Sequence, residues 1–206
     1  MKKIGKYLKS LRKNLKATNR FFSSKHKFER ECWIVKKFLN LKNIDELKKP
    51  DRDPPDVLYR DARFEVIEIL DEGRKRNDEH RERAKKIDEA QKNNSLSPLL
   101  EPFQLSNVSK DEVINEVLRK ITVKESKYAP AVTASLDLLV YVNYLTKRLD
   151  ATSQITIDFK DRFKKWRSVS ILINIDGGFV LYLSPLAPEF LKGLPKFESI
   201  TSKLHS

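Results

Sequence analysis

Two acidic residues, Asp56 and Glu65, stand in segments that are otherwise typical of β-strands. Residues 57–59 and 64–70 are rich in β-branched and aromatic side chains, which favour strands. The polar step Arg60-Asp61 between them predicts a hairpin with a two-residue turn. Asp56 and Glu65 then belong to two paired strands.

The register of this hairpin decides whether the two carboxylates meet. If Arg60 and Asp61 form the loop, Val57 faces Phe64 and Asp56 faces Glu65; a loop of three residues would move one acid to the other face of the sheet. Like charges on directly opposite residues are destabilising. A divalent cation such as Mg²⁺ or Mn²⁺ would relieve the repulsion, because hard cations bind carboxylates, water and phosphate. The pair therefore predicts a metal site.

The same residues carry a family resemblance. Pro55-Asp56, followed nine residues later by Glu65-Val66-Ile67, resembles the PD-(D/E)XK nuclease motif. The run RDARFEVIEILDEGRKRNDEH and the later GGFVLYLSPLAPEFLKG are similar to a family of bacterial proteins described as endonucleases of that superfamily. The similarity extends from Phe28 to about Gly193.

This resemblance implies a fold, a cofactor and an activity. The expected fold is an α/β domain with a mixed sheet flanked by helices, like a restriction endonuclease. Asp56 and Glu65 match metal ligands and catalytic residues of a Mg²⁺-dependent nuclease acting on DNA. Ile67 stands at the position of the motif lysine and cannot activate water, and Lys75 is the nearest substitute along the chain. The alternative is a fold without catalysis that binds nucleic acid or takes part in an assembly.

A third acid, Glu31, is a candidate accessory ligand. It lies inside the apolar stripe of a predicted helix over residues 28–41, and that stripe consists of Phe28, Cys32, Val35, Phe38 and Leu39. A buried carboxylate requires a cation or a hydrogen-bond network. The resemblance places a helical glutamate beside the metal, while the alternative is that Glu31 reaches solvent at the edge of the stripe.

Basic residues dominate the charge of the chain. Lys and Arg number 42 against 29 Asp and Glu, which gives a net charge of +13. Such a field attracts polyanions, and we expect a nucleic-acid partner, DNA rather than RNA. Arg74, Lys75, Arg76 and Arg81 follow the second strand directly and predict contacts with phosphates. The alternative for this helical segment is an exposed surface with ion pairs such as Glu79 with Arg83.

The N-terminal 27 residues contain ten Lys or Arg and no acid. Ile4, Leu8, Leu11 and Leu15 recur at helical spacing, so the segment is predicted to form a basic amphipathic helix or arm. It would lie along phosphates or on an anionic membrane, and the alternative is a solvated tail.

Length and composition set the remaining limits. We expect an arm over 1–27, one domain over 28–193 and a tail over 194–206. Ser109 begins a helix with a capping box that we interpret as structural, and the runs 136–145 and 169–175 are predicted strands. The single cysteine is compatible with a reducing, cytoplasmic compartment, and no apolar run is long enough to span a membrane.

Overall fold

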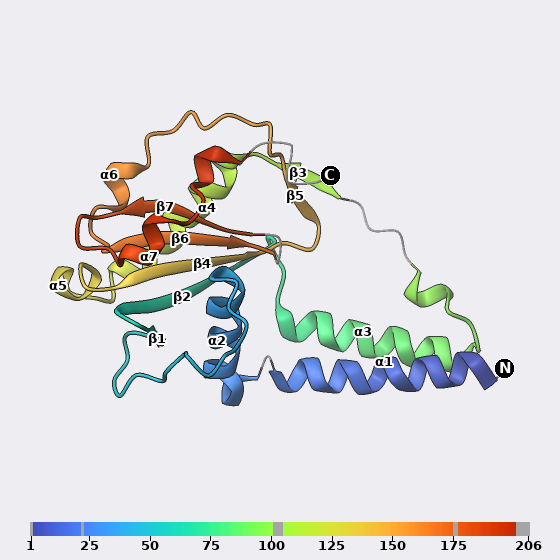
Figure 1. Cartoon of the computed structure of the whole chain (residues 1–206). Coiled ribbons are helices and arrows are strands. Elements are labelled where there is room, and N and C mark those ends of the chain that lie inside the picture. The colour runs from blue at the N-terminus through green and yellow to red at the C-terminus, as the bar shows by residue number, and fades with distance from the viewer. Residues whose placement is uncertain (1, 22, 101–104, 175–176, 201–206) are drawn as a thin grey trace. The chain divides into compact units, whose positions relative to one another are not determined.

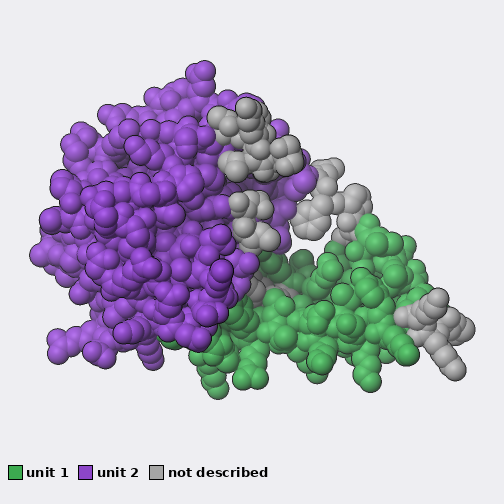
Figure 2. All heavy atoms as spheres, viewed as in Figure 1, with its two compact units in different colours: residues 1–30, 72–104 green, residues 31–71, 105–206 purple. Residues whose placement is uncertain are grey.

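The computed structural model describes residues 2–21, 23–100, 105–174 and 177–200, and its chain forms two compact units. The first unit combines residues 1–30 with 72–104, and the second combines residues 31–71 with 105–206 (Figure 2). The second unit is therefore built from two stretches of chain, separated by an insertion that belongs to the first.

The helices and strands follow one another along the chain as Figure 1 labels them. In order they are α1 (Lys2–Phe21), α2 (Lys27–Phe38), β1 (Val57–Tyr59), β2 (Ala62–Leu70), α3 (Arg76–Lys92), β3 (Ser106–Val108), α4 (Lys110–Glu125), α5 (Pro130–Thr133), β4 (Asp137–Asn143), β5 (Lys147–Leu149), α6 (Lys160–Phe163), β6 (Ser168–Ile173), β7 (Gly177–Leu183) and α7 (Glu189–Lys192). Short 3₁₀ turns occur at Ser24–His26, Ser97–Leu99 and Phe197–Ser199. No described helix has the length and apolar character needed to cross a membrane.

The predicted hairpin and its register are confirmed. Val57 pairs with Phe64, Leu58 with Arg63 and Tyr59 with Ala62 in the antiparallel pair β1–β2. Arg60 has a φ of 51°, in the left-handed region that tight hairpin loops use. The two-residue loop therefore places the segment ahead of Val57 beside Glu65.

The hairpin forms one edge of a five-stranded sheet with the order β1-β2-β4-β6-β7. β2, β4 and β6 run parallel to one another, while β1 and β7 are antiparallel to their neighbours. The predicted strands at 136–145 and 169–175 correspond to β4 and β6. β3 and β5 form a separate two-stranded parallel pair.

Helices cover both faces of this sheet. Alternation along β2 directs Glu65, Ile67 and Ile69 to one face, where the isoleucines join a core with the apolar stripe of α4, namely Val113, Ile114, Val117 and Ile121. On the other face, the ring of Phe38 from α2 meets that of Phe64 at 6.1 Å between centroids. The predicted α/β architecture, a mixed sheet flanked by helices, is confirmed at this level.

The first unit is a helical pair with a small core of its own. Leu8 of α1 is buried with Ile87 and Ala90 of α3, and Ile4, Leu11, Leu15, Leu96 and Leu99 pack around them. Arg12 forms an ion pair with Asp88 across the two helices, which run antiparallel (Figure 1). The predicted N-terminal helix thus exists, and its apolar stripe faces a partner helix.

The two compact units divide the chain differently from the predicted limits. The prediction has an arm over 1–27 and one domain over 28–193, whereas the compact units group residues 72–104 with the N-terminal segment. The reason is the contact between α1 and the insertion, since Ile87 and Ala90 are isolated apolar positions in a strongly charged helix. The predicted tail at 194–206 begins in described residues, and Phe197 packs in the core of the sheet.

Candidate metal centre

Asp56 extends the hairpin pairing by one residue beyond Val57. The backbone N–H of Asp56 donates to the carbonyl of Phe64 at 2.8 Å. Its carboxylate oxygen Oδ2 accepts a hydrogen bond from the backbone N–H of Val66 at 2.9 Å. The carboxylate thus takes the place of a strand carbonyl as the acceptor for the Val66 N–H. This hydrogen bond holds the Asp56 carboxylate against β2.

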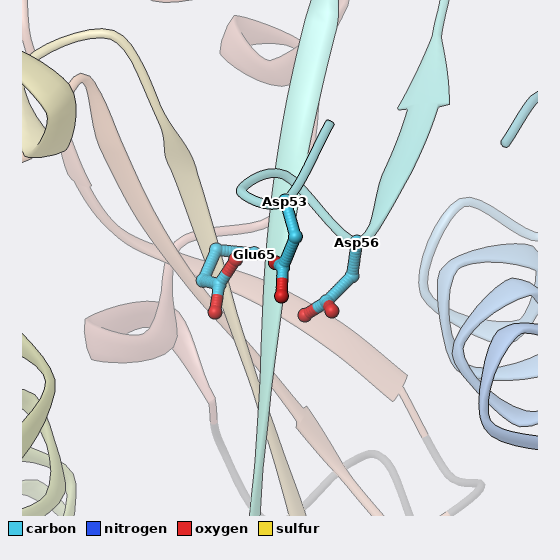
Figure 3. A group of neighbouring side chains, drawn as sticks. All are labelled: Asp53, Asp56 and Glu65. Carbon is cyan, nitrogen blue, oxygen red and sulfur yellow. The ribbon is translucent and has the colours of Figure 1, made fainter. Parts of the chain in front are cut away.

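Three carboxylates converge at this point of the sheet edge. One oxygen from each of Asp53, Asp56 and Glu65 lies within 4.8 Å of the others. Figure 3 shows Asp53 and Asp56 extending from the segment ahead of β1 toward Glu65 on β2. Asp53 is exposed, whereas the other two are buried. Three carboxylate oxygens this close to one another are a donor set suited to a hard divalent cation.

Glu65 is the most deeply buried member of the group, with 1% of its surface exposed. Its Oε1 accepts a hydrogen bond from the Tyr128 hydroxyl at 2.9 Å and forms an ion pair with Lys124. Its Oε2 is buried and has no hydrogen-bond partner among the described residues. A buried carboxylate oxygen without a partner is costly, and a cation among the three acids would satisfy it.

Opposing effects act on the pKa of Glu65. Burial raises the pKa of Glu65, the negative charge of Asp56 raises it further, and the contacts with Lys124 and Tyr128 lower it; the net direction is upward. Burial lowers the pKa of Lys124, but its contacts with Glu65 outweigh that effect and raise it overall. The two groups are therefore coupled: contact with Lys124 lowers the pKa of Glu65 against the effects of burial and Asp56, and contact with Glu65 raises the pKa of Lys124 against the effect of burial.

Lys124 lies in the last turn of the capping-box helix α4, and Tyr128 follows three residues after the helix ends at Glu125. Ser109 and Glu112 form both hydrogen bonds of that box, so the beginning of α4 is confirmed as predicted. The helix packs its apolar stripe on β2, and its last turn carries Lys124 to Glu65. Burial and the charge of Glu65 raise the pKa of Tyr128, which keeps its hydroxyl protonated and able to donate. The helix that we interpreted as structural thus also supplies a cation to the acids.

The structure places the other predicted residues of the motif as follows. Ile67 is a core residue on the α4 side of β2. Glu31 is buried on α2 with 6% exposure, and it does not belong to the group of three carboxylates. Lys75 is an exposed residue directly before α3, in the first unit. The roles assigned to Glu31 and Lys75 stay predictions.

The predicted phosphate-binding residues also lie in the first unit. Arg74 forms an ion pair with Glu79, five residues along the chain. Arg76 begins α3, and Arg81 is an exposed residue of the same helix. Their contact with nucleic acid stays a prediction.

Sequence reasoning missed Asp53, Lys124 and Tyr128. Asp53 had a local signal, because it stands three residues before Asp56 in the step Asp53-Pro54-Pro55-Asp56. Lys124 and Tyr128 are four residues apart along the chain, on either side of the end of α4. Nothing in that spacing connects them to Glu65, which lies 59 residues before Lys124.

Comparison with protein families gives the context for this site. Residues 5–196 match the model of a family described as "Putative endonuclease, protein of unknown function (DUF1780)". The chain belongs to this family. The family description names an endonuclease and an unknown function, and it names no metal, motif or substrate.

A solved structure is also similar over most of its length. It is a protein of unknown function from Pseudomonas aeruginosa strain PAO1, described as belonging to the monooxygenase superfamily. The identity is 25%, the TM-score is 0.57, and the match covers 92% of this chain and 91% of the other. No curated protein matches the chain.

Proposed function

We propose that the protein is a metal-dependent nuclease that hydrolyses phosphodiester bonds of DNA. The observation that carries the proposal is the group of three carboxylates, in which the buried Glu65 Oε2 has no hydrogen-bond partner among the described residues. The family description, which names an endonuclease, supports the same activity.

Mg²⁺ or Mn²⁺ would be held by Asp56 and Glu65, with Asp53 as the exposed third ligand. The donor set fits, since it consists of carboxylate oxygens without histidine or cysteine. When bound, the cation supplies a hydroxide near neutral pH and offsets the negative charge that develops on the phosphate. Glu31, buried on α2, is proposed as an accessory ligand.

Lys124 is proposed to take the part of the lysine that Ile67 replaces. In hydrolysis a water oxygen forms a bond to phosphorus and gives a proton to solvent, while the bond from phosphorus to one sugar oxygen breaks and that oxygen takes up a proton from solvent. The Lys124 ammonium, held at Glu65 Oε1 with Tyr128 beside it, can donate to a phosphate oxygen or to the attacking water. Lys75 is the competing assignment from the sequence.

The first experiment is a calorimetric titration of Mg²⁺ and Mn²⁺ into the wild type, followed by incubation with plasmid DNA. Glu65→Gln should abolish metal binding and cleavage. The matched control is Glu68→Gln, the same substitution on the opposite face of β2, where Asn143 donates to Glu68 Oε1 at 3.0 Å. Absence of metal binding by the wild type would overturn the proposal. Metal binding without cleavage would favour the alternative of a nucleic-acid-binding protein.

A second experiment decides between the two lysines. Lys124→Met should reduce cleavage by at least a hundredfold, the size expected for a group that stabilises transition-state charge, while Lys120→Met on the same helix should not. If Lys75→Met abolishes cleavage and Lys124→Met does not, the sequence-based assignment is right. Metal titration of each variant shows whether the loss lies in binding or in the chemical step.

A further inference from the structure

The positive charge of the protein is concentrated in one of its two units. Residues 1–30 and 72–104 contain 19 Lys and Arg against 8 Asp and Glu, so the first unit carries +11 of the net charge of +13. The second unit, which holds the carboxylate group, is close to neutral. The field that attracts polyanions therefore originates mainly from the helical pair.

Within that pair, the two helices differ in the pattern of their charges. α3 mixes six basic with five acidic residues, whereas α1 has eight basic residues and no acid. Mixed charges on one helix neutralise each other through pairs at a spacing of three or four residues. α1 is thus the source of unbalanced charge.

The lysines of α1 form a single stripe. Lys6, Lys9, Lys13 and Lys16 are exposed and fall within about 80° of one another on a helical projection at 100° per residue. None of the four has an acidic partner within the described parts of the chain. Like charges at this spacing repel one another and destabilise a helix, so the stripe lacks the counter-charge that an anionic partner would supply.

The apolar side of α1 identifies the kind of partner. A helix that binds a membrane surface inserts its apolar face among the lipids. In α1 that face is occupied, because Leu8 is buried against Ile87 and Ala90 of α3. The stripe lies about 150° from it on the same projection. The charged side of α1 is exposed, which suits a ligand recognised by charge.

We propose that the lysine stripe of α1 is the docking surface for the phosphate backbone of nucleic acid. Resting on the proposed nuclease function, this assigns backbone binding to a helix outside the unit that holds the carboxylates. The stripe spans about 15 Å from Lys6 to Lys16 at 1.5 Å per residue, enough to meet successive phosphates of one strand. No base-reading contact is required, so binding is independent of sequence.

The test is binding of a fluorescent DNA duplex of about 20 base pairs, long enough to present many phosphates, measured by anisotropy in EDTA so that no cleavage occurs. A variant with Lys6, Lys9, Lys13 and Lys16 changed to Gln should bind more than tenfold more weakly. The slope of log affinity against log salt should fall by about 3 to 4, since each phosphate contact contributes about 0.9. The variant should remain folded and equally stable or more stable, because repulsion is removed.

The matched control removes the same charge from the second unit. Lys42, Lys160, Lys192 and Lys196 are exposed there, and changing all four to Gln should leave most of the affinity and slope intact. Equal losses in the two variants would overturn the proposal, as would unchanged binding in the stripe variant. The proposal would also be overturned if the stripe variant lost binding to phosphatidylserine vesicles but kept its binding to DNA. The binding assay contains EDTA and requires neither metal nor cleavage. Its outcome therefore tests the stripe even if the nuclease proposal fails.

Discussion

Two buried carboxylates on neighbouring strands, Asp137 and Glu65, differ in how well they are satisfied. Asp137 at the start of β4 is fully buried and forms an ion pair with Arg167. It also accepts hydrogen bonds from the Ser168 hydroxyl at 2.8 Å and the backbone N–H of Arg63 at 2.9 Å. Both oxygens of Asp137 have partners, whereas Oε2 of Glu65 has none among the described residues.

The difference separates an acid that stabilises the fold from one that is available for chemistry. The contacts of Asp137 join β2, β4 and β6 at one end of the sheet, and nothing remains on it for a ligand to satisfy. Glu65 is equally buried, but it faces two further acids. Burial alone does not distinguish the two roles, and the completeness of the hydrogen bonding does.

The largest expected effect is on stability at Asp137. Asp137→Ala should lower the free energy of unfolding by about 3 to 5 kcal/mol, since it leaves the Arg167 guanidinium without its carboxylate. Urea denaturation followed by circular dichroism measures the change. A loss below about 1 kcal/mol, the worth of an exposed pair, would show that Asp137 is no more structural than Glu65.

The next effect concerns Asp56, whose side chain both repels Glu65 and accepts from Val66. Asp56→Asn keeps the acceptor and removes the charge, so it should abolish metal binding and leave stability unchanged or higher. Asp56→Ala loses the hydrogen bond as well and should be less stable than the Asn variant by about 1 kcal/mol. Strong destabilisation by Asn itself would mean that the negative charge of Asp56 is structural, as it is at Asp137.

The pH dependence of stability gives a smaller effect of defined sign. The folded-state pKa of Glu65 is raised by burial and by Asp56, so its favourable contribution is present below the unfolded pKa of about 4.3 and is lost as pH rises through the folded pKa. In metal-free buffer, wild type should therefore lose stability relative to Glu65→Gln across that window. If the wild type instead gains stability relative to Glu65→Gln as pH rises, the charged form of Glu65 stabilises the fold, as we infer for Asp137.

The smallest effect tests Glu31, a third buried acid. Burial and the charge of Glu31 raise the pKa of the Cys32 thiol to about 12, so this single cysteine should react very slowly with a small thiol reagent. Glu31→Gln should speed the reaction. If Glu31 is an accessory ligand, Mg²⁺ should also speed it in the wild type by neutralising that charge. No response to Mg²⁺ would exclude the accessory role.

Local chemistry made part of this site predictable from sequence. The two-residue loop fixed the hairpin register, because side chains alternate with a period of two and Val57 and Phe64 both belong inside. The approach of Asp56 to Glu65 follows from that register. The capping box at Ser109 likewise predicted the start of α4, since it depends on four consecutive residues.

The rest depends on tertiary packing that no local pattern encodes. Lys124 reaches Glu65 only because the apolar stripe of α4 lies on β2. Proximity to Ile67 along the chain points to Lys75 instead. The sequence of α3 likewise predicts an exposed charged helix, because its contact with α1 is also a feature of tertiary packing. Its buried positions, Ile87 and Ala90, are too few to give a clear amphipathic pattern.

The packing of α1 on α3 also affects what happens when the chain is shortened. Removing the first 27 residues would take away Leu8 and leave Ile87 and Ala90 facing water. Exposed apolar surface of this kind promotes aggregation, and the loss of the basic helix would lower solubility further, since net charge keeps proteins apart. Such a truncated protein would be expected to self-associate, so its failure to bind any ligand would reflect aggregation as much as the absence of lysines.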